Sequence, residues 1–398
     1  MGRQIIDTDI AIIGGGVAGL WLLNQLRNRG YSVVLFEREA LGSYQTIGSQ
    51  GMIHGGIKYA LAGALSNSSE TLAAMPAMWR QCLRGEGKVD LRGCRVLSED
   101  FFLWSNAGMQ SRLASFFASR LLRGRVERVA AGRYPAPLRS ADFRGQVYRL
   151  EDLVLDVPSL VATLAQRHRD VIFAIDWQHA ALRRLRRQAV LDVQGCTIVP
   201  GKLLLTAGAG NEALLTALGS TGPAMQRRPL QQVLARHQYS GDLFGHCMGS
   251  NPSPRLTISS HRDSAGRPVW YLGGDLATNG ADEEPARLIA RARRELADLL
   301  PWVDLGDARW ATLRLERAEP RQASLLRPDS AFVGKLDSVD NALAAWPTKL
   351  TLCPDLGDQV ERQLAAEGML PRCRPDLAPL APLGRPPLAS PYWDTLFS

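Results

Sequence analysis

Residues 9–38 read DIAIIGGGVAGLWLLNQLRNRGYSVVLFER, and this stretch decides the fold. Its first apolar run, residues 10–13, has the length and composition of a strand that is buried on both faces. Three glycines with the spacing G-x-G-x-x-G, Gly14, Gly16 and Gly19, follow directly. A helical apolar pattern comes next, and a second apolar run closes the stretch. This order predicts a strand, a glycine turn, a helix and a second strand, which together form a Rossmann-like unit.

The glycines and the start of the helix suit a pyrophosphate. Gly14 permits the tight turn, Gly16 lets the main chain approach a phosphate, and Gly19 lets the helix pack closely on the sheet. The helix begins near Val17 and Ala18, and its positive N-terminal end favours an anion there. We therefore expect the main chain of these five residues to bind the phosphates of a dinucleotide.

Glu37, at the end of the second apolar run, follows about 20 positions after the glycines. An acidic side chain at this point accepts hydrogen bonds from a ribose, and Arg38 is its neighbour. The complete pattern favours a bound dinucleotide over the alternative, an ordinary crossover with an unoccupied turn. FAD and NAD sites share this pattern, so these residues alone leave the choice between the two open.

The composition is that of a globular protein. The chain has 398 residues, enough for two or three domains, with 45% apolar and 22% charged residues. Its six cysteines include no C-x-x-C pair, so we expect neither a zinc site nor a disulfide scaffold, and no metal. We find no secretory leader and no apolar stretch of the roughly 18 residues that a membrane span needs. We therefore expect a cytoplasmic protein.

The formal net charge of +8 is consistent with three kinds of partner: RNA, a membrane surface and an anionic substrate. Arginines gather in two clusters, at positions 120–128 and 183–187. We interpret the first as a solvated helix face and the second as a solvated hairpin, and we therefore expect no nucleic-acid partner. Apolar residues at 113–122, beside the first cluster, leave open a weak contact with a membrane surface.

The rest of the chain predicts one fold built from interleaved segments. The alternating patterns after Pro223 indicate a second domain, with an antiparallel sheet, inserted into the first. The proline-rich end, residues 371–398, has no periodic pattern, and we expect Trp393 and Phe397 to anchor it to the body. Periodicity predicts helices at 68–84, 159–169 and 284–300, strands at 171–175, 189–193, 197–199, 202–205, 233–238, 255–260 and 269–273, and a turn at 263–266.

Residues 46–59, TIGSQGMIHGGIKY, resemble the flavin-contacting segment of FAD-dependent oxidoreductases of the D-amino-acid oxidase superfamily. This superfamily includes glycine oxidase, 2-hydroxyglutarate dehydrogenase and glycerol-3-phosphate dehydrogenase. The likeness is strongest to the hydroxy-acid and glycerol-phosphate branches. There a glycine, two apolar residues, a histidine, a small residue and a glycine precede an aromatic residue. Gly51, His54, Gly56 and Tyr59 match this pattern in place.

Three further segments are similar to the family and follow in the family's order. They are LTAGAGN at residues 205–211, QRRPL at 226–230 and WPTKLTLCP at 346–354. The resemblance implies that the first is a second FAD-binding turn, that the second crosses into the substrate domain, and that the third lies beside the flavin ring. Together these segments favour FAD over NAD.

The motifs and the resemblance together define the expected FAD site. The helix expected after Pro354 directs its N-terminal end at the flavin, where it stabilises the negative charge of the reduced ring. We expect noncovalent FAD, because Cys353 reads as a small buried thiol. The FAD-binding residues expected are Gly14, Gly16, Val17, Ala18, Gly19, Glu37, Arg38, Thr46, Ser49, Gln50, Gly51, Ala207, Gly208, Lys349, Leu350 and Thr351.

Flavin dehydrogenation also needs a base and an anchor for the substrate. His54 is the candidate base or substrate-binding group, because histidine transfers protons near neutral pH. The alternatives are a loop histidine that holds main chain and, as in some relatives, a covalent link to the flavin.

Arg317 and Arg321 are the candidate anchors, because a guanidinium binds carboxylate or phosphate through two hydrogen bonds. The alternative is a surface ion pair with Glu316 or Glu319. The late arginine–proline segment, RQASLLRPD at 321–329, departs from the family's spacing, so the resemblance assigns no carboxylate-binding arginine.

The predicted fold class is α/β. It is a Rossmann-like GxGxxG FAD-binding domain of the glutathione-reductase type, with an inserted α+β substrate domain whose sheet is mixed and largely antiparallel. The expected boundaries are 1–80, 150–224 and 320–398 for the FAD-binding domain, and 81–149 and 225–319 for the substrate-binding domain.

The predicted function is oxidation of a CH–NH or CH–OH group of a small amine, amino acid or hydroxy acid, by hydride transfer to flavin N5. Oxygen or a quinone is the expected electron acceptor. Two alternatives stay open. One is an FAD enzyme that acts on an RNA-borne amine, for which the positive charge is the only support. The other is a flavin-binding redox sensor without turnover.

Overall fold

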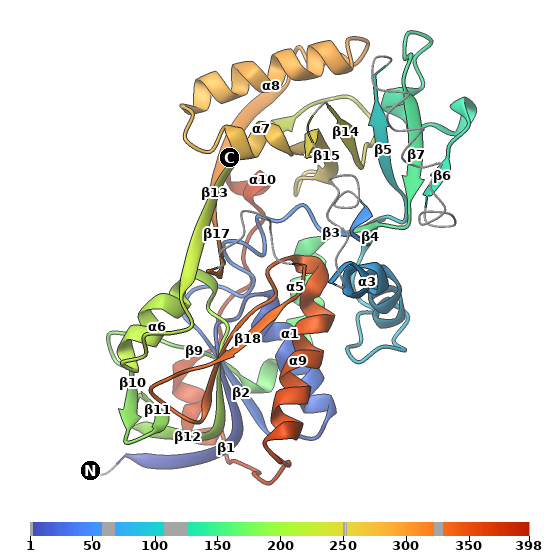
Figure 1. Cartoon of the computed structure of the whole chain (residues 1–398). Helices are drawn as coiled ribbons and strands as arrows, with labels where there is room; N and C mark the ends of the chain where they lie inside the picture. Colours follow the sequence, from blue (N-terminus) through green and yellow to red (C-terminus); the bar gives the residue numbers. More distant parts are fainter. Residues whose placement is uncertain are drawn as a thin grey trace.

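The computed structural model describes residues 3–57, 68–106, 126–249, 251, 253–321 and 329–397. Two units, each built on an eight-stranded sheet, make up the described chain (Figure 1). The unit that holds the N-terminus has a mixed sheet with a parallel centre, which we call the parallel sheet. The sheet of the unit at the opposite end is largely antiparallel, and we call it the antiparallel sheet. The two sheets confirm the predicted fold class, and the domain boundaries stay a prediction.

The first sheet has the strand order β10-β11-β12-β1-β2-β9, and β19 pairs with both β12 and β18. Five strands, β1, β2, β9, β12 and β19, run parallel, so their carboxyl ends meet at one edge. The strand bounds are β1 (Gln4–Ile13), β2 (Val33–Glu37), β9 (Ile172–Ala174), β10 (Ala181–Leu185), β11 (Gln188–Val193), β12 (Cys196–Leu205), β18 (Phe332–Lys335) and β19 (Ala342–Trp346).

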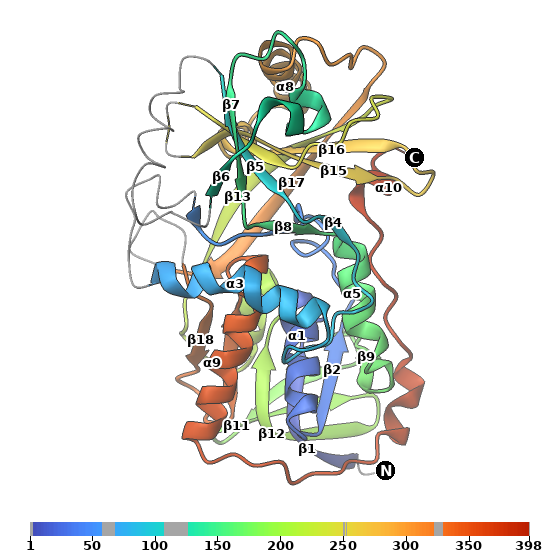
Figure 2. The ribbon, with the colours of Figure 1, turned by 90° about the vertical axis from the view of Figure 1, so that its right-hand side faces the viewer.

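Helices cover both faces of the parallel strands. Figure 2 shows α1, α5 and α9 in front of this sheet. Leu20, Leu23 and Leu26 of α1 are fully buried in the core beneath these helices, as the apolar pattern predicts. The helix bounds are α1 (Val17–Asn28), α3 (Ser68–Leu83), α5 (Val157–Gln166), α6 (Asn211–Ala217) and α9 (Cys353–Ala366), with short 3-10 turns η5 (Arg169–Val171), η6 (Gly208–Gly210) and η7 (Leu350–Leu352).

The second sheet has the strand order β17-β13-β16-β15-β14-β5-β7-β6. Its neighbouring strands are antiparallel apart from β14 and β5, which confirms the predicted mixed, largely antiparallel sheet. The paired strands β13 and β17 run from the first unit into the second (Figure 1). The bounds are β5 (Phe101–Ser105), β6 (Val126–Arg128), β7 (Gln146–Leu150), β13 (Met225–Arg236), β14 (Gly245–Met248), β15 (Pro254–Arg262), β16 (Pro268–Gly273) and β17 (Arg309–Pro320).

The two faces of the second sheet have different neighbours. The outer face packs Trp270 and Leu272 against Leu288 and Leu296 of α8. The inner face carries Tyr271 and is directed at the first unit, with the small sheet β3-β8-β4 between them (Figure 2). The remaining elements are β3 (Met52–Ile53), β4 (Val96–Ser98), β8 (Leu153–Leu155), α7 (Asp275–Asn279), α8 (Pro285–Leu299), η3 (Ala131–Arg133) and η4 (Ala136–Leu138).

The C-terminal segment runs along the molecule from the first unit to the second, through η8 (Ala378–Leu383) and α10 (Tyr392–Thr395) (Figure 2). A parallel bridge joins Leu388 to Leu41. At its end, Trp393 is 2% exposed and stacks on the ring of His261, with ring centroids 4.5 Å apart. Phe397 is also buried. The predicted anchoring by Trp393 and Phe397 is confirmed.

One predicted division is wrong. Residues 197–199 and 202–205 do not form two strands but lie in the single strand β12, which pairs with β1 from Gln4 to Ile13. Pro200 lies within this pairing. Because a proline lacks only its own N–H and favours extended backbone, it interrupts one ladder bond without ending the strand.

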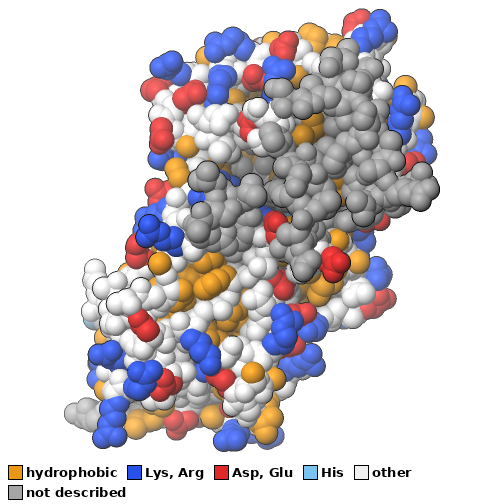
Figure 3. Space-filling view, in the orientation of Figure 1, with side chains coloured by type: hydrophobic (Ala, Val, Ile, Leu, Met, Phe, Trp, Pro, Cys, Tyr) orange, Lys and Arg blue, Asp and Glu red, His pale blue; other side chains and the backbone are white. Residues whose placement is uncertain are grey.

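The second arginine cluster forms the hairpin of β10 and β11, where Arg183 pairs with Asp192 and Arg187 with Asp340. The prediction of a solvated hairpin is confirmed. Residues 113–125, which include most of the first cluster, lie outside the described residues. Basic and acidic side chains are interspersed over the described part of the face in Figure 3. Among the described helices, none is long and apolar enough to cross a membrane.

Candidate active site

The glycine turn joins β1 to α1 at the carboxyl edge of the parallel strands. Gly14 has a φ of +110°, and a Cβ there would lie 2.7 Å from the main chain of Ala207. A Cβ on Gly19 would lie 2.0 Å from the carbonyl oxygen of Gly14. Since neither approach leaves room for a methyl group, the turn requires glycine at both positions.

The N-terminus of α1 is open in front of Gly16. Among the described residues, a Cβ on Gly16 would meet only Thr46 Oγ1 within 4 Å, at 3.3 Å. The same oxygen accepts a hydrogen bond of 3.1 Å from Val17 N. Ala18 is buried behind it, and the first turn of α1 contains no acidic residue. A positive helix end with open space before it fits a phosphate.

Glu37 lies at the end of β2, beside the glycine turn. Its carboxylate accepts hydrogen bonds from the N–H groups of Gly15, at 2.6 Å, and Glu39, at 2.8 Å. The side chain is half-buried, so these contacts fix the carboxylate while leaving lone pairs for a further donor. Arg38 is exposed and pairs with Glu39 and Tyr44.

The second predicted FAD-binding turn lies directly against the first. Thr206 Oγ1 donates to the carbonyl of Gly14 at 2.9 Å, and Ala207 and Gly208 follow it. Trp346 Nε1 donates to Gly208 O at 3.1 Å. The fold therefore joins the glycine turn to two of the segments that resemble the family.

His54 follows β3 and is 7% exposed. Its main-chain N–H donates to Thr351 Oγ1 at 3.1 Å, across 297 positions of sequence. The next residue, Gly55, donates its N–H to Asp152 Oδ1 at 2.8 Å. The structure thus brings the His54 segment to the turn before α9. This agrees with the expectation that both segments lie beside the flavin ring. Tyr59, the aromatic end of the family match, lies outside the described residues.

Residues 349–351 precede α9, at the end of the helix that carries its positive charge. Lys349 is 6% exposed, and its Nζ donates to Asp329 Oδ1 at 2.9 Å. Its main-chain N–H donates to Pro347 O at 2.6 Å. Because the N–H of Lys349 has this partner, Leu350 and Thr351 are the better candidates among the predicted main-chain donors.

The loop before β3 is held to the second sheet. Gln50 Nε2 donates to Ser259 Oγ at 3.1 Å and to Tyr271 O at 2.7 Å. The hydroxyl of Tyr271 donates to Gly48 O at 2.9 Å. The amide nitrogen of Gln50 is therefore occupied by β15 and β16.

Ser49 and Gly51 shape the end of this loop. Ser49 Oγ accepts a weak hydrogen bond of 3.4 Å from Gly51 N. Gly51 has a φ of +73°, and a Cβ there would lie 2.0 Å from Leu155 O of β8. Glycine is therefore required where the loop enters the small sheet.

The two candidate anchor arginines lie in different surroundings. Arg317 is half-buried on β17 opposite Arg228 of β13, and its Nε donates to Arg228 O at 3.5 Å. Arg321 is exposed beyond the strand, and its N–H donates to Ala224 O. Of the two candidates, Arg317 is therefore the less exposed. The two acids considered as competing partners pair with other arginines, Glu316 with Arg227 and Glu319 with Arg228.

Sequence comparison decides the family. The family described as FAD-dependent oxidoreductase (DAO) matches residues 9–336. The chain belongs to this family. FAD is therefore the cofactor of this DAO-family enzyme. The glycine turn, the open start of α1 and the fixed Glu37 carboxylate fit the adenosine diphosphate half of FAD.

Among its relatives, the DAO-family chain is 49% identical to the probable FAD-dependent oxidoreductase PA4991 of Pseudomonas aeruginosa, over 99% of this chain and 100% of the relative. The crystal structure of PA4991 matches with a TM-score of 0.86 at 44% identity, over 100% of both chains. Glycine oxidase from Geobacillus kaustophilus matches with a TM-score of 0.65 at 18% identity, over 94% of this chain and 98% of that one. L-α-glycerophosphate oxidase from Mycoplasma pneumoniae, solved with FAD bound, matches with 0.64 at 12% identity, over 96% and 99%.

Four contacts that support the DAO-family site were not predicted from the sequence. Thr206 holds the two turns together, Gln45 Oε1 accepts from Ala318 N of β17, Asp152 holds Gly55, and Tyr271 holds Gly48. Thr206 lies within one recognised motif and Gln45 adjoins another, so both carry a local signal. Asp152 and Tyr271 act across 97 and 223 positions, so only the fold identifies them.

Proposed function

We propose that this chain oxidises a CH–NH or CH–OH group of a small amine, amino acid or hydroxy acid. The observation that carries the proposal is the position of the loop at residues 48–51. This loop is bonded to the inner face of the second sheet through Gln50 and Tyr271, and the strand that follows leads to His54. A substrate bound between that face and the His54 segment would lie beside the cofactor. When bound, FAD takes up the two electrons and the hydrogen that leave the substrate carbon.

We assign the two halves of FAD to two groups of residues. The glycine turn, Glu37 and the second turn suit the adenosine diphosphate half, with Arg38 at its edge. The loop at 46–51 and the turn at 349–351 suit the ring half, with the N–H groups of Leu350 and Thr351 and the positive end of α9 directed at it.

The chain supplies a base and an anchor. His54 is assigned as the group that accepts the hydroxyl or amine proton, or that hydrogen-bonds the substrate. A purely structural role for its ring is the competing assignment. Arg317 is assigned as the anchor for a substrate carboxylate or phosphate, because it is half-buried on the strand that crosses the loop. Arg321 is the weaker candidate, since it is exposed.

We propose noncovalent FAD. Cys353 is fully buried, and burial raises the pKa of its thiol well above the ordinary value. A protonated thiol is a poor nucleophile, so this side chain is unsuited to a covalent link. We also keep oxygen or a quinone as the acceptor, and a cytoplasmic location, as proposals. Amine and hydroxyl substrates rank equally, because the glycine oxidase and the glycerophosphate oxidase resemble this chain to the same degree in fold.

The proposal is tested by anaerobic reduction of the purified holoprotein. Amino acids, N-methyl amino acids, hydroxy acids and polyol phosphates are added in turn while the flavin absorbance is followed. Bleaching by one class identifies the bond that is oxidised, and readmitted oxygen separates an oxidase from a dehydrogenase. Bound FAD that no substrate bleaches would instead identify a redox sensor. Retention of RNA that is lost on adding salt would point to an RNA-borne amine.

A further inference from the structure

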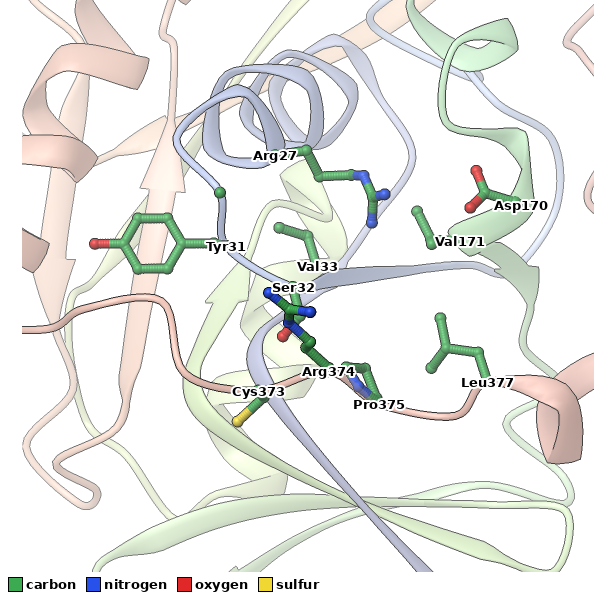
Figure 4. Close-up of a pocket in the computed structure, with 11 residues that line it drawn as sticks. Arg27, Tyr31, Ser32, Val33, Asp170, Val171, Cys373, Arg374, Pro375 and Leu377 are labelled. Carbon is green, nitrogen blue, oxygen red and sulfur yellow. The ribbon is translucent and has the colours of Figure 1, made fainter.

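A groove of about 430 Å³ lies at the end of the parallel sheet opposite the glycine turn (Figure 4). It is lined by Val33 at the start of β2, whereas Glu37 of the FAD site lies at the end of that strand. Its walls come from three segments far apart in sequence, residues 27–33, 170–171 and 373–377. The groove is therefore separate from the FAD site, and the tertiary fold alone creates it.

Two arginines enter this groove from different elements. Figure 4 shows Arg27 extending from the end of α1 and Arg374 from the C-terminal segment, with Ser32 and Val33 between them. Within the described part of the chain, neither guanidinium has a carboxylate at ion-pair distance. Nearby arginines do have such partners: Arg29 pairs with Glu361 at 2.9 Å and Arg167 with Asp90 at 2.5 Å.

The wall that carries Arg374 is fixed by a buried carboxylate. Asp9 is 3% exposed, and its Oδ1 accepts the N–H groups of Arg372, at 3.0 Å, and Cys373, at 2.9 Å. Its Oδ2 accepts the N–H and the hydroxyl of Ser32 on the facing segment, at 2.9 and 3.0 Å. One side chain thus ties the C-terminal segment to the turn before β2. The spacing of the two walls does not depend on a ligand.

The other residues that line the groove indicate which chemical groups it could bind besides an anion. Val33, Val171 and Leu377 give the groove an apolar part, and Asp170 is the single acidic residue among those that line it. A volume of this size is within the range of small-molecule sites. Guanidinium groups bind carboxylate and phosphate oxygens through paired, charge-assisted hydrogen bonds.

We propose that this groove is a second binding site, for a small organic anion whose carboxylate or phosphate group lies between Arg27 and Arg374. Asp170 accepts from a hydroxyl or amino group of the same ligand, and the apolar part of the groove covers its carbon atoms. The ligand connects α1 to the C-terminal segment, which continues to Trp393 on the second sheet.

Isothermal titration calorimetry of the FAD-loaded protein tests the site, with succinate and inorganic phosphate as separate probes. Bound FAD keeps the phosphate-binding turn at Gly16 filled. We expect saturable binding of at least one probe, and the probe that binds more tightly distinguishes a carboxylate from a phosphate ligand. The double variant Arg27→Gln with Arg374→Gln should lower that affinity at least tenfold. The control Arg372→Gln, an exposed arginine of the same segment outside the groove, should change it less than twofold.

Hydrogen–deuterium exchange gives a second readout. The probe should slow exchange in residues 373–377 and leave the glycine turn unchanged. Three results would overturn the proposal: no saturable binding of either probe, equal affinity in the double variant, or protection at the glycine turn instead. The FAD content and thermal midpoint of each variant establish that it is folded.

Discussion

The two sheets contribute to the active site by different physical means. The parallel sheet contributes through a short motif whose glycines admit no side chain, since a Cβ on Gly14 or Gly19 would lie 2.0–2.7 Å from main chain. The antiparallel sheet contributes through single side-chain contacts between distant residues, such as Gln50 with Ser259 and Tyr271 with Gly48. The half of the site for the adenosine end is therefore encoded locally, whereas the half for the substrate depends on tertiary packing.

The largest effect should come from Gly19→Ala in the parallel unit. Alanine is the better helix former, but its Cβ would lie 2.0 Å from Gly14 O, and this clash outweighs a propensity gain of about 1 kcal/mol. We expect loss of FAD and a fall of more than about 3 kcal/mol in the free energy of unfolding, measured by denaturant titration. Gly132→Ala is the control, because a Cβ there has no neighbour within 4 Å among the described residues. Retention of FAD by Gly19→Ala would show that the turn is not rigid.

Thr351→Val tests the junction between the His54 segment and α9. The change removes the acceptor of the His54 N–H in a fully buried position, which costs about 2 kcal/mol. We expect slower substrate bleaching with FAD affinity changed only a few-fold, measured by stopped-flow absorbance and by FAD titration. Thr216→Val, on the exposed face of α6, should alter neither quantity. A normal bleaching rate in Thr351→Val would show that the hydrogen bond between His54 and Thr351 does not affect the oxidation step.

Glu367 makes the parallel unit sensitive to acid. Burial alone would raise its pKa, but hydrogen bonds from Lys202, Lys335 and Gln363 lower the pKa from 4.5 to about 2. Since the folded-state pKa lies below the unfolded one, the stabilisation is complete above about pH 4.5 and is lost as the pH falls towards 2. Glu367→Gln should lose about 1–2 kcal/mol at pH 7 after allowance for solvent screening. Its unfolding free energy should also vary less between those pH values. Glu70→Gln, at an exposed position, should retain the wild-type curve.

The smallest effect should come from Tyr271→Phe in the antiparallel unit. The ring stays, and the loss of one buried hydrogen bond to Gly48 O costs about 1 kcal/mol. We expect a bleaching rate reduced a few-fold with unchanged FAD affinity, because the loop position changes while the glycine turn does not. Tyr239→Phe, in the segment that follows β13, is the control. Weaker FAD binding in Tyr271→Phe, with normal bleaching, would contradict the division between the two sheets.

The contrast between a local motif and contacts between distant residues also explains which parts of the fold can be predicted from the sequence. The strand, turn and helix at Gly14 follow from local sterics and periodicity, so the pattern alone identifies them. The short strands β4 to β7 and β14 were not predicted, because three to five residues carry too little periodicity. Breaking β12 at Pro200 was wrong, because the pairing with β1 outweighs a local signal.

The candidate site shows the same contrast. His54 and Thr351 were each expected near the ring, and the structure joins them by a hydrogen bond. The bond from Gln50 to the second sheet was not expected, because its partners lie 209 and 221 positions away. The anion groove could not be predicted either, because its lining comes from three separate segments.

We propose that this chain uses its FAD to oxidise a CH–NH or CH–OH group beside His54. The most direct measurement is anaerobic single-turnover bleaching by the best substrate, compared between the wild-type protein and His54→Ala at matched FAD content. We expect a loss of about a hundredfold or more in the variant, with FAD affinity nearly unchanged. Equal rates in the two proteins would show that His54 is not the base, and no bleaching by any amine or hydroxy substrate would rule out this reaction.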